Sequence, residues 1–356
     1  MDTPQARRAL DGIPVYRPGK AAASDDHKLS SNENPYAPLP GVMERAAAEL
    51  GRMNRYPDAG MTVLYDALAA RFGLPADHFA AGTGSVAVLF ALLTAHLEPG
   101  DEIVYAWRSF EAYPIAADLT GATTVRVPLR ADATHDLNAM AAAVTERTRV
   151  VLVCTPNNPT GPVVTAAELV TFLSAVPAHV LVVVDEAYVE FVRDPEAASG
   201  LAALADHPNV VVLRTFSKAY GLAGLRVGYA IARPAIATAI RKATPPFAVT
   251  DLSQAAAVAS LELQERLDER VEAIVQERVA MVTALRQQGW DVPDTEANFV
   301  WLPLGDDALD FSVACDPVSV RPFAGEGVRV SIGTPAVNAE LVALAGVWRA
   351  SRTGWA

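Results

Sequence analysis

The sequence predicts an α/β fold with a mostly parallel sheet in a large domain, followed by a smaller α+β domain. Between residues 103 and 231, short apolar runs rich in β-branched residues alternate with helical stretches. Strands that are apolar throughout are buried on both faces, as in parallel sheets between two layers of helices. After Pro245 and Pro246 the pattern changes to a long helical stretch and then to short strands.

The elements can be placed in chain order from these patterns. Strands of the large sheet are expected at 103–106, 124–127, 150–154, 180–184, 210–213 and 227–231. Helices are expected at 41–50, 61–72, 86–96, 113–119, 137–144, 166–176 and 201–205. The second domain should contain helices at 253–288 and 337–350 and strands at 298–302, 318–321 and 328–332. Ligands of such sheets gather at the carboxyl ends of the strands.

This pattern divides the chain into three segments. They are an N-terminal arm and lid (1–50) that joins the small domain, a large domain (51–246) and a small C-terminal domain (247–356).

The net charge of −12 argues against a nucleic-acid partner or an anionic membrane surface. Cys154 and Cys315 suggest neither a disulfide framework nor a metal site, which fits a reducing cytoplasm. We expect no signal peptide and no membrane span.

One stretch, residues 215–228, places a single amine among groups that bind anions. It reads TFSKAYGLAGLRVG, with Thr215 and Ser217 around Lys218 and with Arg226 among three glycines. Loss of hydration lowers the pKa of an amine, and a neutral amine can form a Schiff base with a carbonyl. Because the hydroxyls and the guanidinium suit a phosphate, the stretch favours pyridoxal 5′-phosphate as a cofactor. Taken alone, it also fits a surface lysine between turns.

A second turn of small residues, Gly82-Thr83-Gly84-Ser85, precedes the predicted helix 86–96 and could cradle a phosphate with backbone N–H groups. Together with Ala87 and Asp101 it also matches a dinucleotide fingerprint, G-x-G-x-x-A. We expect residues 78–81 to make a poor buried strand, so an NAD-dependent dehydrogenase remains the weaker alternative.

Two further polar groups follow predicted strands. Asn158 lies in CTPNNPTG after one strand, where the following proline keeps its backbone extended. Asp185 ends the apolar run 180–184, and a buried carboxylate is costly unless it meets a cation such as a protonated pyridine nitrogen. A capped turn and a helix N-cap, respectively, would also explain these residues.

In this order, CTPNNPTG, VVVDEAY and TFSKAYGLAGLRVG resemble the fold-type I pyridoxal-phosphate aminotransferases. LSSNENPYAP, NRYPD and GVRVSIGT narrow the resemblance to the histidinol-phosphate aminotransferase family, over residues 28–334. The resemblance implies that Lys218 binds the cofactor and moves the substrate proton, while Asp185 pairs with the ring nitrogen. It further implies contacts to the ring oxygen from Asn158 and Tyr188, and stacking by Phe110. The phosphate contacts it implies come from Gly84, Ser85, Thr215, Ser217, Arg226 and, in a homodimer, Tyr56 of the neighbouring subunit.

For the substrate, the resemblance implies that Arg329 grips the acid group and that Asn34 and Tyr36 belong to a segment that closes over the site. Arg321 is either a second cation or a strand-end residue. Histidinol phosphate would use both arginines. However, AWRSFEAYP resembles the actinobacterial aromatic amino acid branch of the family, and Trp107, Phe110, Tyr36 and Phe323 could wall an aromatic ring. We therefore favour transamination of phenylalanine, tyrosine or tryptophan with 2-oxoglutarate, and histidinol-phosphate transamination is the alternative.

Other classes share parts of this pattern. A relative that decarboxylates threonine phosphate has many of the same motifs and would release an amine rather than a 2-oxo acid. A pyridoxal-phosphate regulator would need a DNA-binding module, and the sequence shows no basic helix-turn-helix.

Overall fold

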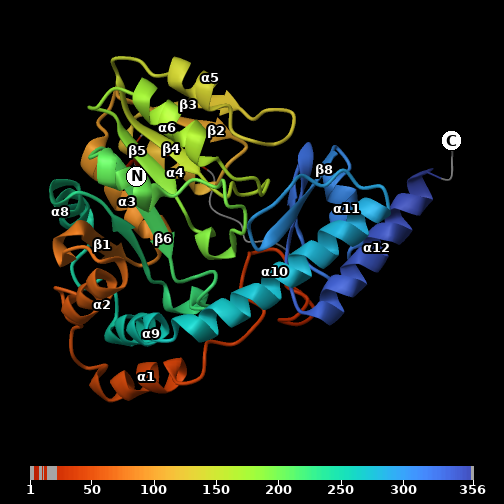
Figure 1. Ribbon diagram of the computed structural model, residues 1–356, viewed down its shortest axis with the longest axis horizontal. Coiled ribbons are helices and arrows are strands. Elements are labelled where there is room, and N and C mark those ends of the chain that lie inside the picture. The colour runs from red at the N-terminus through yellow and green to blue at the C-terminus, as the bar shows by residue number, and fades with distance from the viewer. Residues whose placement is uncertain (1–3, 8–9, 11, 14–21, 354–356) are drawn as a thin grey trace.

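A seven-stranded sheet between two layers of helices forms the larger part of the molecule (Figure 1). The computed structural model describes residues 4–7, 10, 12–13 and 22–353, so the expected arm at residues 1–30 lies partly outside the described residues. The strand order is β1-β7-β6-β5-β4-β2-β3. The strands are β1 Phe79–Gly82, β2 Glu102–Trp107, β3 Thr123–Pro128, β4 Thr148–Cys154, β5 Leu181–Asp185, β6 Val210–Thr215 and β7 Gly228–Ile231.

Strands β2 to β6 run parallel, whereas β7 is antiparallel to β6 and β1 is antiparallel to β7. Along β4, Val151 and Val153 point into one buried cluster, and Val150 and Leu152 point into the other. Successive side chains of a strand face opposite sides. The continuous apolar runs of the sequence are thus explained, and the predicted mostly parallel α/β sheet is confirmed.

Helices cover both faces of this sheet, and those between β1 and β6 connect its strands. They are α2 Thr62–Phe72, α3 Ser85–His96, α4 Ala112–Thr120, α5 Leu137–Ala142, α6 Ala166–Ala175, α7 Gly200–Asp206 and α8 Pro234–Ala243. Helix α1 Val42–Ala48 precedes them and packs on α9 (Asp251–Leu261) instead. Local sequence determines where several of these helices begin. At α6, for example, Thr165 accepts from the backbone of Glu168, whose side chain accepts in return from the backbone of Thr165.

The smaller part has a three-stranded antiparallel sheet, β8-β10-β9, beside long helices. Helix α9 Asp251–Leu261 packs on α1 and α2 and leads into this part. The elements that follow are α10 Gln264–Gln287, β8 Phe299–Gly305, α11 Ala308–Ala314, β9 Arg321–Phe323, β10 Glu326–Ser331 and α12 Pro335–Thr353. Figure 1 shows α10 running from α9 across to α11 and α12. The N-terminal segment also reaches this part, because Ser319 N donates to His27 O and Ser331 N donates to Leu29 O.

Several sequence-based expectations were wrong. Residues 79–82 do form a buried strand, β1, although Phe79 is its one large apolar side chain. The helical region 253–288 is two helices, because Leu263 leaves the helical conformation between α9 and α10. The strand expected at 318–321 begins only at Arg321, and helices α8 and α11 were missed. Within the described residues, no helix is both long and apolar enough to cross a membrane.

Candidate active site

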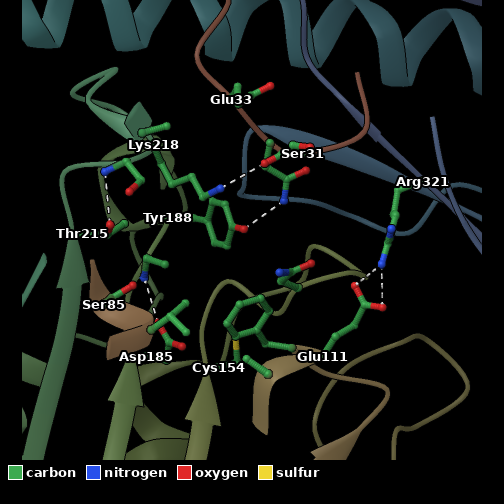
Figure 2. A pocket seen from close by; sticks show the side chains of 18 of the residues that line it. Ser31, Glu33, Ser85, Glu111, Cys154, Asp185, Tyr188, Thr215, Lys218 and Arg321 are labelled. Carbon is green, nitrogen blue, oxygen red and sulfur yellow. Dashed lines mark hydrogen bonds and ion pairs between the residues drawn. The ribbon is translucent and has the colours of Figure 1, made fainter. Parts of the chain in front are cut away.

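A cavity of about 660 Å³ opens at the carboxyl end of the large sheet, beside the N-terminal segment (Figure 2). Three of its lining residues end neighbouring strands: Cys154 on β4, Asp185 on β5 and Thr215 on β6. Polar side chains at this edge can meet because parallel strands bring their carboxyl ends together.

The amine of Lys218 projects into this cavity from the turn after β6. Its Nζ donates to the carbonyl oxygen of Ser31 at 3.2 Å and lies 5.7 Å from the centre of the Tyr188 ring. Loss of hydration is the main cause that lowers the pKa of Lys218 to about 7, and the nearby charge of Arg329 adds to it. Near neutral pH, a large fraction of this amine is therefore unprotonated.

Asp185 is a buried carboxylate on the same side of the cavity. Its Oδ2 accepts from the hydroxyl of Tyr113 at 2.7 Å, and its Oδ1 accepts from Ala187 N at 3.3 Å. Burial raises the pKa of Asp185 to about 6, although the Tyr113 hydrogen bond favours the charged form. The carboxylate is thus mostly ionised at pH 7 and can pair with a cation. Sequence reasoning missed Tyr113.

A second part of the cavity is shaped to hold an anion. The side chains of Ser85, Thr215, Ser217 and Arg226 line it. Arg226 Nη1 lies 3.4 Å from Ser217 Oγ. Glycines make room for these groups: a Cβ on Gly84 would lie 2.6 Å from Arg226 Nη2, and one on Gly228 would lie 2.2 Å from Ser85 N. Hydroxyls, a guanidinium and the start of α3 together suit a phosphate.

Arg329 joins the small sheet to the large domain at the cavity wall. Its Nη1 donates to Asn158 Oδ1 at 2.6 Å, and its Nη2 donates to the carbonyl of Ser30 at 2.7 Å. Both Arg329 and Asn158 are buried. A guanidinium in this position can bind a carboxylate with two parallel hydrogen bonds.

The N-terminal segment contributes Ser30, Ser31, Asn32 and Glu33 to the lining, which the sequence did not single out. The amide of Asn32 donates to the hydroxyl of Tyr188 at 2.9 Å. Asn34, which was singled out, instead donates from Nδ2 to the backbone carbonyls of Lys218 and Ala219 at 3.3 and 2.8 Å. Tyr36 N donates to Asn34 Oδ1 at 3.0 Å. Asn34 therefore fastens this segment to the Lys218 turn.

The expected aromatic walls are only partly present. Phe110 lines the cavity and meets the Tyr113 ring edge to face at 5.6 Å. Trp107 and Phe323, both within the described chain, lie outside the lining. Trp107 is flanked by the guanidiniums of Arg108 and Arg126, and Phe323 packs on Trp301. Phe90 and Ile115 line the cavity instead, and no sequence motif marked them.

Two other expected residues have distinct positions. Arg321 lines the cavity, and its Nη2 donates to both carboxylate oxygens of Glu111, at 3.0 and 3.1 Å. Tyr56 lies outside the lining on the surface, 79% exposed, where its ring stacks on the half-exposed Phe247 at 4.6 Å.

The fold, with a lysine and a buried carboxylate at the carboxyl edge of its sheet, defines a fold-type I pyridoxal-phosphate enzyme. The chain belongs to the aminotransferase class I and II family, whose model matches residues 24–343. It is 58% identical to an aromatic amino acid aminotransferase of Streptomyces avermitilis, over 94% of this chain and 95% of that protein. It is 57% identical to the aromatic amino acid aminotransferase of Thermobifida fusca, over 94% of each. Among solved structures, the histidinol-phosphate aminotransferase of Sinorhizobium meliloti in complex with pyridoxal-5′-phosphate has a TM-score of 0.88 at 28% identity, covering 98% of this chain and 99% of that one.

Proposed function

We propose that this chain transaminates aromatic L-amino acids with 2-oxoglutarate, giving an aromatic 2-oxo acid and L-glutamate. The observation that carries the proposal is a near-neutral amine, Lys218, in one cavity with Asp185, Arg226 and Arg329. That set provides a nucleophile, a partner for a ring nitrogen, a phosphate ligand and a carboxylate ligand.

The residues present fit pyridoxal phosphate. Asp185 would hold the ring nitrogen, and Asn158 and Tyr188 the ring oxygen. The phosphate would lie in the space that Gly84 and Gly228 keep open beside Ser85, Thr215, Ser217 and Arg226. When bound, this cofactor supplies an aldehyde for amines and a ring that withdraws electrons from the substrate α-carbon.

The protein's own groups bind, orient and move protons. Arg329 binds the α-carboxylate and so fixes the α-carbon near Lys218 Nζ. Because its pKa is about 7, Lys218 can accept the α-proton at Nζ and return it to a neighbouring atom without a large energetic penalty. Asp185 stays ionised with the help of Tyr113 and stabilises positive charge facing it.

The aromatic substrate is supported by two observations. The relatives that are 57–58% identical are named for aromatic amino acids, whereas the solved structure named for histidinol phosphate is 28% identical. Phe90, Phe110 and Ile115 also give the cavity an apolar wall. An uncharged ring gains by leaving water against such a wall, which a phosphate does not.

The proposed homodimer, the domain division and the cytoplasmic location rest on the positions of a few residues and on composition. Exposed Tyr56 would reach the cofactor phosphate of a second subunit in a homodimer. The N-terminal segment makes hydrogen bonds to both Lys218 and Ser331, which supports its role as a lid over the site. The division of the chain at residues 50 and 246 is part of the same proposal. Two free, buried cysteines suit the cytoplasm.

Side-by-side kinetics tests the proposal. Holoenzyme should convert L-phenylalanine and 2-oxoglutarate to phenylpyruvate and glutamate with a kcat/KM at least about tenfold above that for histidinol phosphate. A preference for histidinol phosphate would overturn the substrate assignment. Release of an amine instead of a 2-oxo acid would overturn the reaction. Borohydride should also fix the cofactor to a peptide that contains Lys218.

A further inference from the structure

Two arginines of the small sheet stand side by side at the cavity. Arg321 on β9 and Arg329 on β10 are directly paired in the antiparallel register. Both line the cavity, and the guanidinium carbon of each lies 5.9 Å from the centre of the Phe323 ring. Like charges directly opposite on neighbouring strands repel, so the pair needs a counter-charge.

Glu111 supplies that counter-charge from the large domain. It directly precedes α4 and reaches across to Arg321 with both carboxylate oxygens (Figure 2). The side chains of Arg321 and Glu111 are 15% and 32% exposed, so water screens the pair only in part. Arg329 has different partners, Asn158 and the Ser30 carbonyl. The charge of Arg321 is therefore balanced by a carboxylate, whereas these two partners of Arg329 are uncharged and leave its positive charge available to an incoming anion.

Glu111 also lies beside the apolar wall of the cavity. Phe110 and Ala112, its chain neighbours, line the cavity, as does Ile115 one turn further along α4. A substrate whose α-carboxylate lies on Arg329 would direct its side chain toward this wall and toward the Arg321–Glu111 pair. A neutral ring meets a compensated ion pair there, whereas an anionic side chain meets the Glu111 carboxylate.

We propose that Glu111 is a specificity-determining residue, which neutralises Arg321 so that the cavity favours uncharged aromatic side chains over anionic ones. This inference rests on the proposed function. An anionic side chain, including that of the proposed co-substrate 2-oxoglutarate, can use Arg321 only after displacing Glu111, which lowers its affinity without excluding it. Replacing Glu111 with an uncharged residue should therefore favour the anionic ligand and leave the aromatic one unaffected.

Calorimetric titration of the holoenzyme with two non-reacting acids tests this. Glutarate carries a second carboxylate, and 3-phenylpropanoate carries a ring. Glu111→Gln should bind glutarate roughly 10-fold more tightly, the effect of one partly exposed charge pair, and should bind 3-phenylpropanoate within about twofold of wild type. An unchanged ratio of the two Kd values, or weaker glutarate binding, would overturn the proposal. The side chain of Glu111 makes no cap hydrogen bond to α4, so this change removes no helix cap.

Two further variants separate specificity from domain contact. Glu326→Gln removes the partner of Arg108 in another ion pair between the large domain and β10, outside the cavity lining. It should leave the ratio of the two Kd values unchanged. If Glu326→Gln changed this ratio as much as Glu111→Gln, the cause would be the loss of an ion pair between the two domains and not the neutralisation of Arg321. In the background of Arg321→Met, Glu111→Gln should give no gain for glutarate. A gain that persists there would also overturn the proposal.

These Kd values do not depend on turnover. If wild-type holoenzyme fails to transaminate phenylalanine but the Kd ratio shifts as expected, the proposed function fails and Glu111 keeps its role. If transamination is observed and the ratio does not shift, only the role of Glu111 fails.

Discussion

The hydroxyl of Tyr113 donates a 2.7 Å hydrogen bond to Asp185, from a side chain that is itself fully buried. Tyr113 lies on α4 and Asp185 ends β5, so the contact joins a helix on one face of the sheet to its carboxyl edge. This hydrogen bond offsets part of the cost of keeping a carboxylate out of water.

Tyr113→Phe should weaken the cofactor site. Losing the hydrogen bond moves the pKa of Asp185 further above 6, so less of it is ionised at pH 7. We expect roughly 10-fold weaker pyridoxal phosphate binding and an acid limb of the kcat/KM profile shifted upward by up to about one pH unit. Tyr105→Phe is the matched control, because Tyr105 is equally buried but its hydroxyl faces Arg126. Equal effects of the two changes would argue against a specific role.

Lys218→Met should reduce transamination by at least roughly 10³-fold, since the nucleophile and proton acceptor are lost. Lys242→Met on the exposed face of α8 should retain activity. Retained turnover in the Lys218 variant would remove this residue from its role.

The same Lys218 variant should change the pH dependence of apoenzyme stability. The folded pKa of about 7 lies below the ordinary value of 10.5, so the unfolded chain binds more protons between these values. Stability contributed by this group is therefore lowest below pH 7 and rises toward pH 10.5. In urea titrations, Lys218→Met should be more stable than wild type at pH 6, with a difference that shrinks by pH 10. A constant difference would contradict the shifted pKa.

Gly228→Ala should damage the phosphate end of the cavity. The added methyl would lie 2.2 Å from Ser85 N, a backbone atom that cannot move without shifting the start of α3. We expect a loss of about 1–3 kcal/mol in unfolding free energy and weaker cofactor binding. At the exposed Gly51 an added methyl has no neighbour within 4 Å, so Gly51→Ala should change neither the free energy of unfolding nor cofactor binding. Normal cofactor affinity in Gly228→Ala would refute this packing argument.

Mixed dimers test the proposal that the chain forms a homodimer in which Tyr56 acts on the neighbouring subunit. Neither Lys218→Ala nor Tyr56→Ala alone should be active at limiting pyridoxal phosphate. After subunit exchange, half of the dimers pair one of each, and one of their two sites contains both Lys218 and a neighbouring Tyr56. Activity should recover to roughly a quarter of wild type. If Tyr56 served its own subunit, exchange would restore nothing.

The sequence predicted the parts of the fold and site that depend on local pattern. Apart from β3, which reads TTVRVP and is largely not buried, the strands from β2 to β7 contain continuous apolar runs. Asp185, Thr215 and Lys218 could be found because they follow such runs. Strand β1 was not predicted, because three of its four residues are small and give only a weak apolar pattern although they are buried.

The missed residues depend on contacts between distant segments. Tyr113 and Asp185 are 72 positions apart, Asn32 and Tyr188 are 156 apart, and Glu111 and Arg321 are 210 apart. No local spacing encodes such pairs. For the same reason Trp107 could be expected beside a substrate, although two guanidiniums cover its ring in the folded chain.

The low pKa of Lys218 also makes this position chemically addressable. An ordinary solvated lysine, with a pKa near 10.4, is almost entirely protonated at pH 7, so its amine reacts slowly with electrophiles. The chain has only three other lysines, Lys20, Lys28 and Lys242. A brief pulse of a small acylating reagent at pH 7 should therefore label Lys218 of the apoenzyme ahead of the other three lysines. The extent of labelling would then report, in a mixture, how much of the protein carries its cofactor.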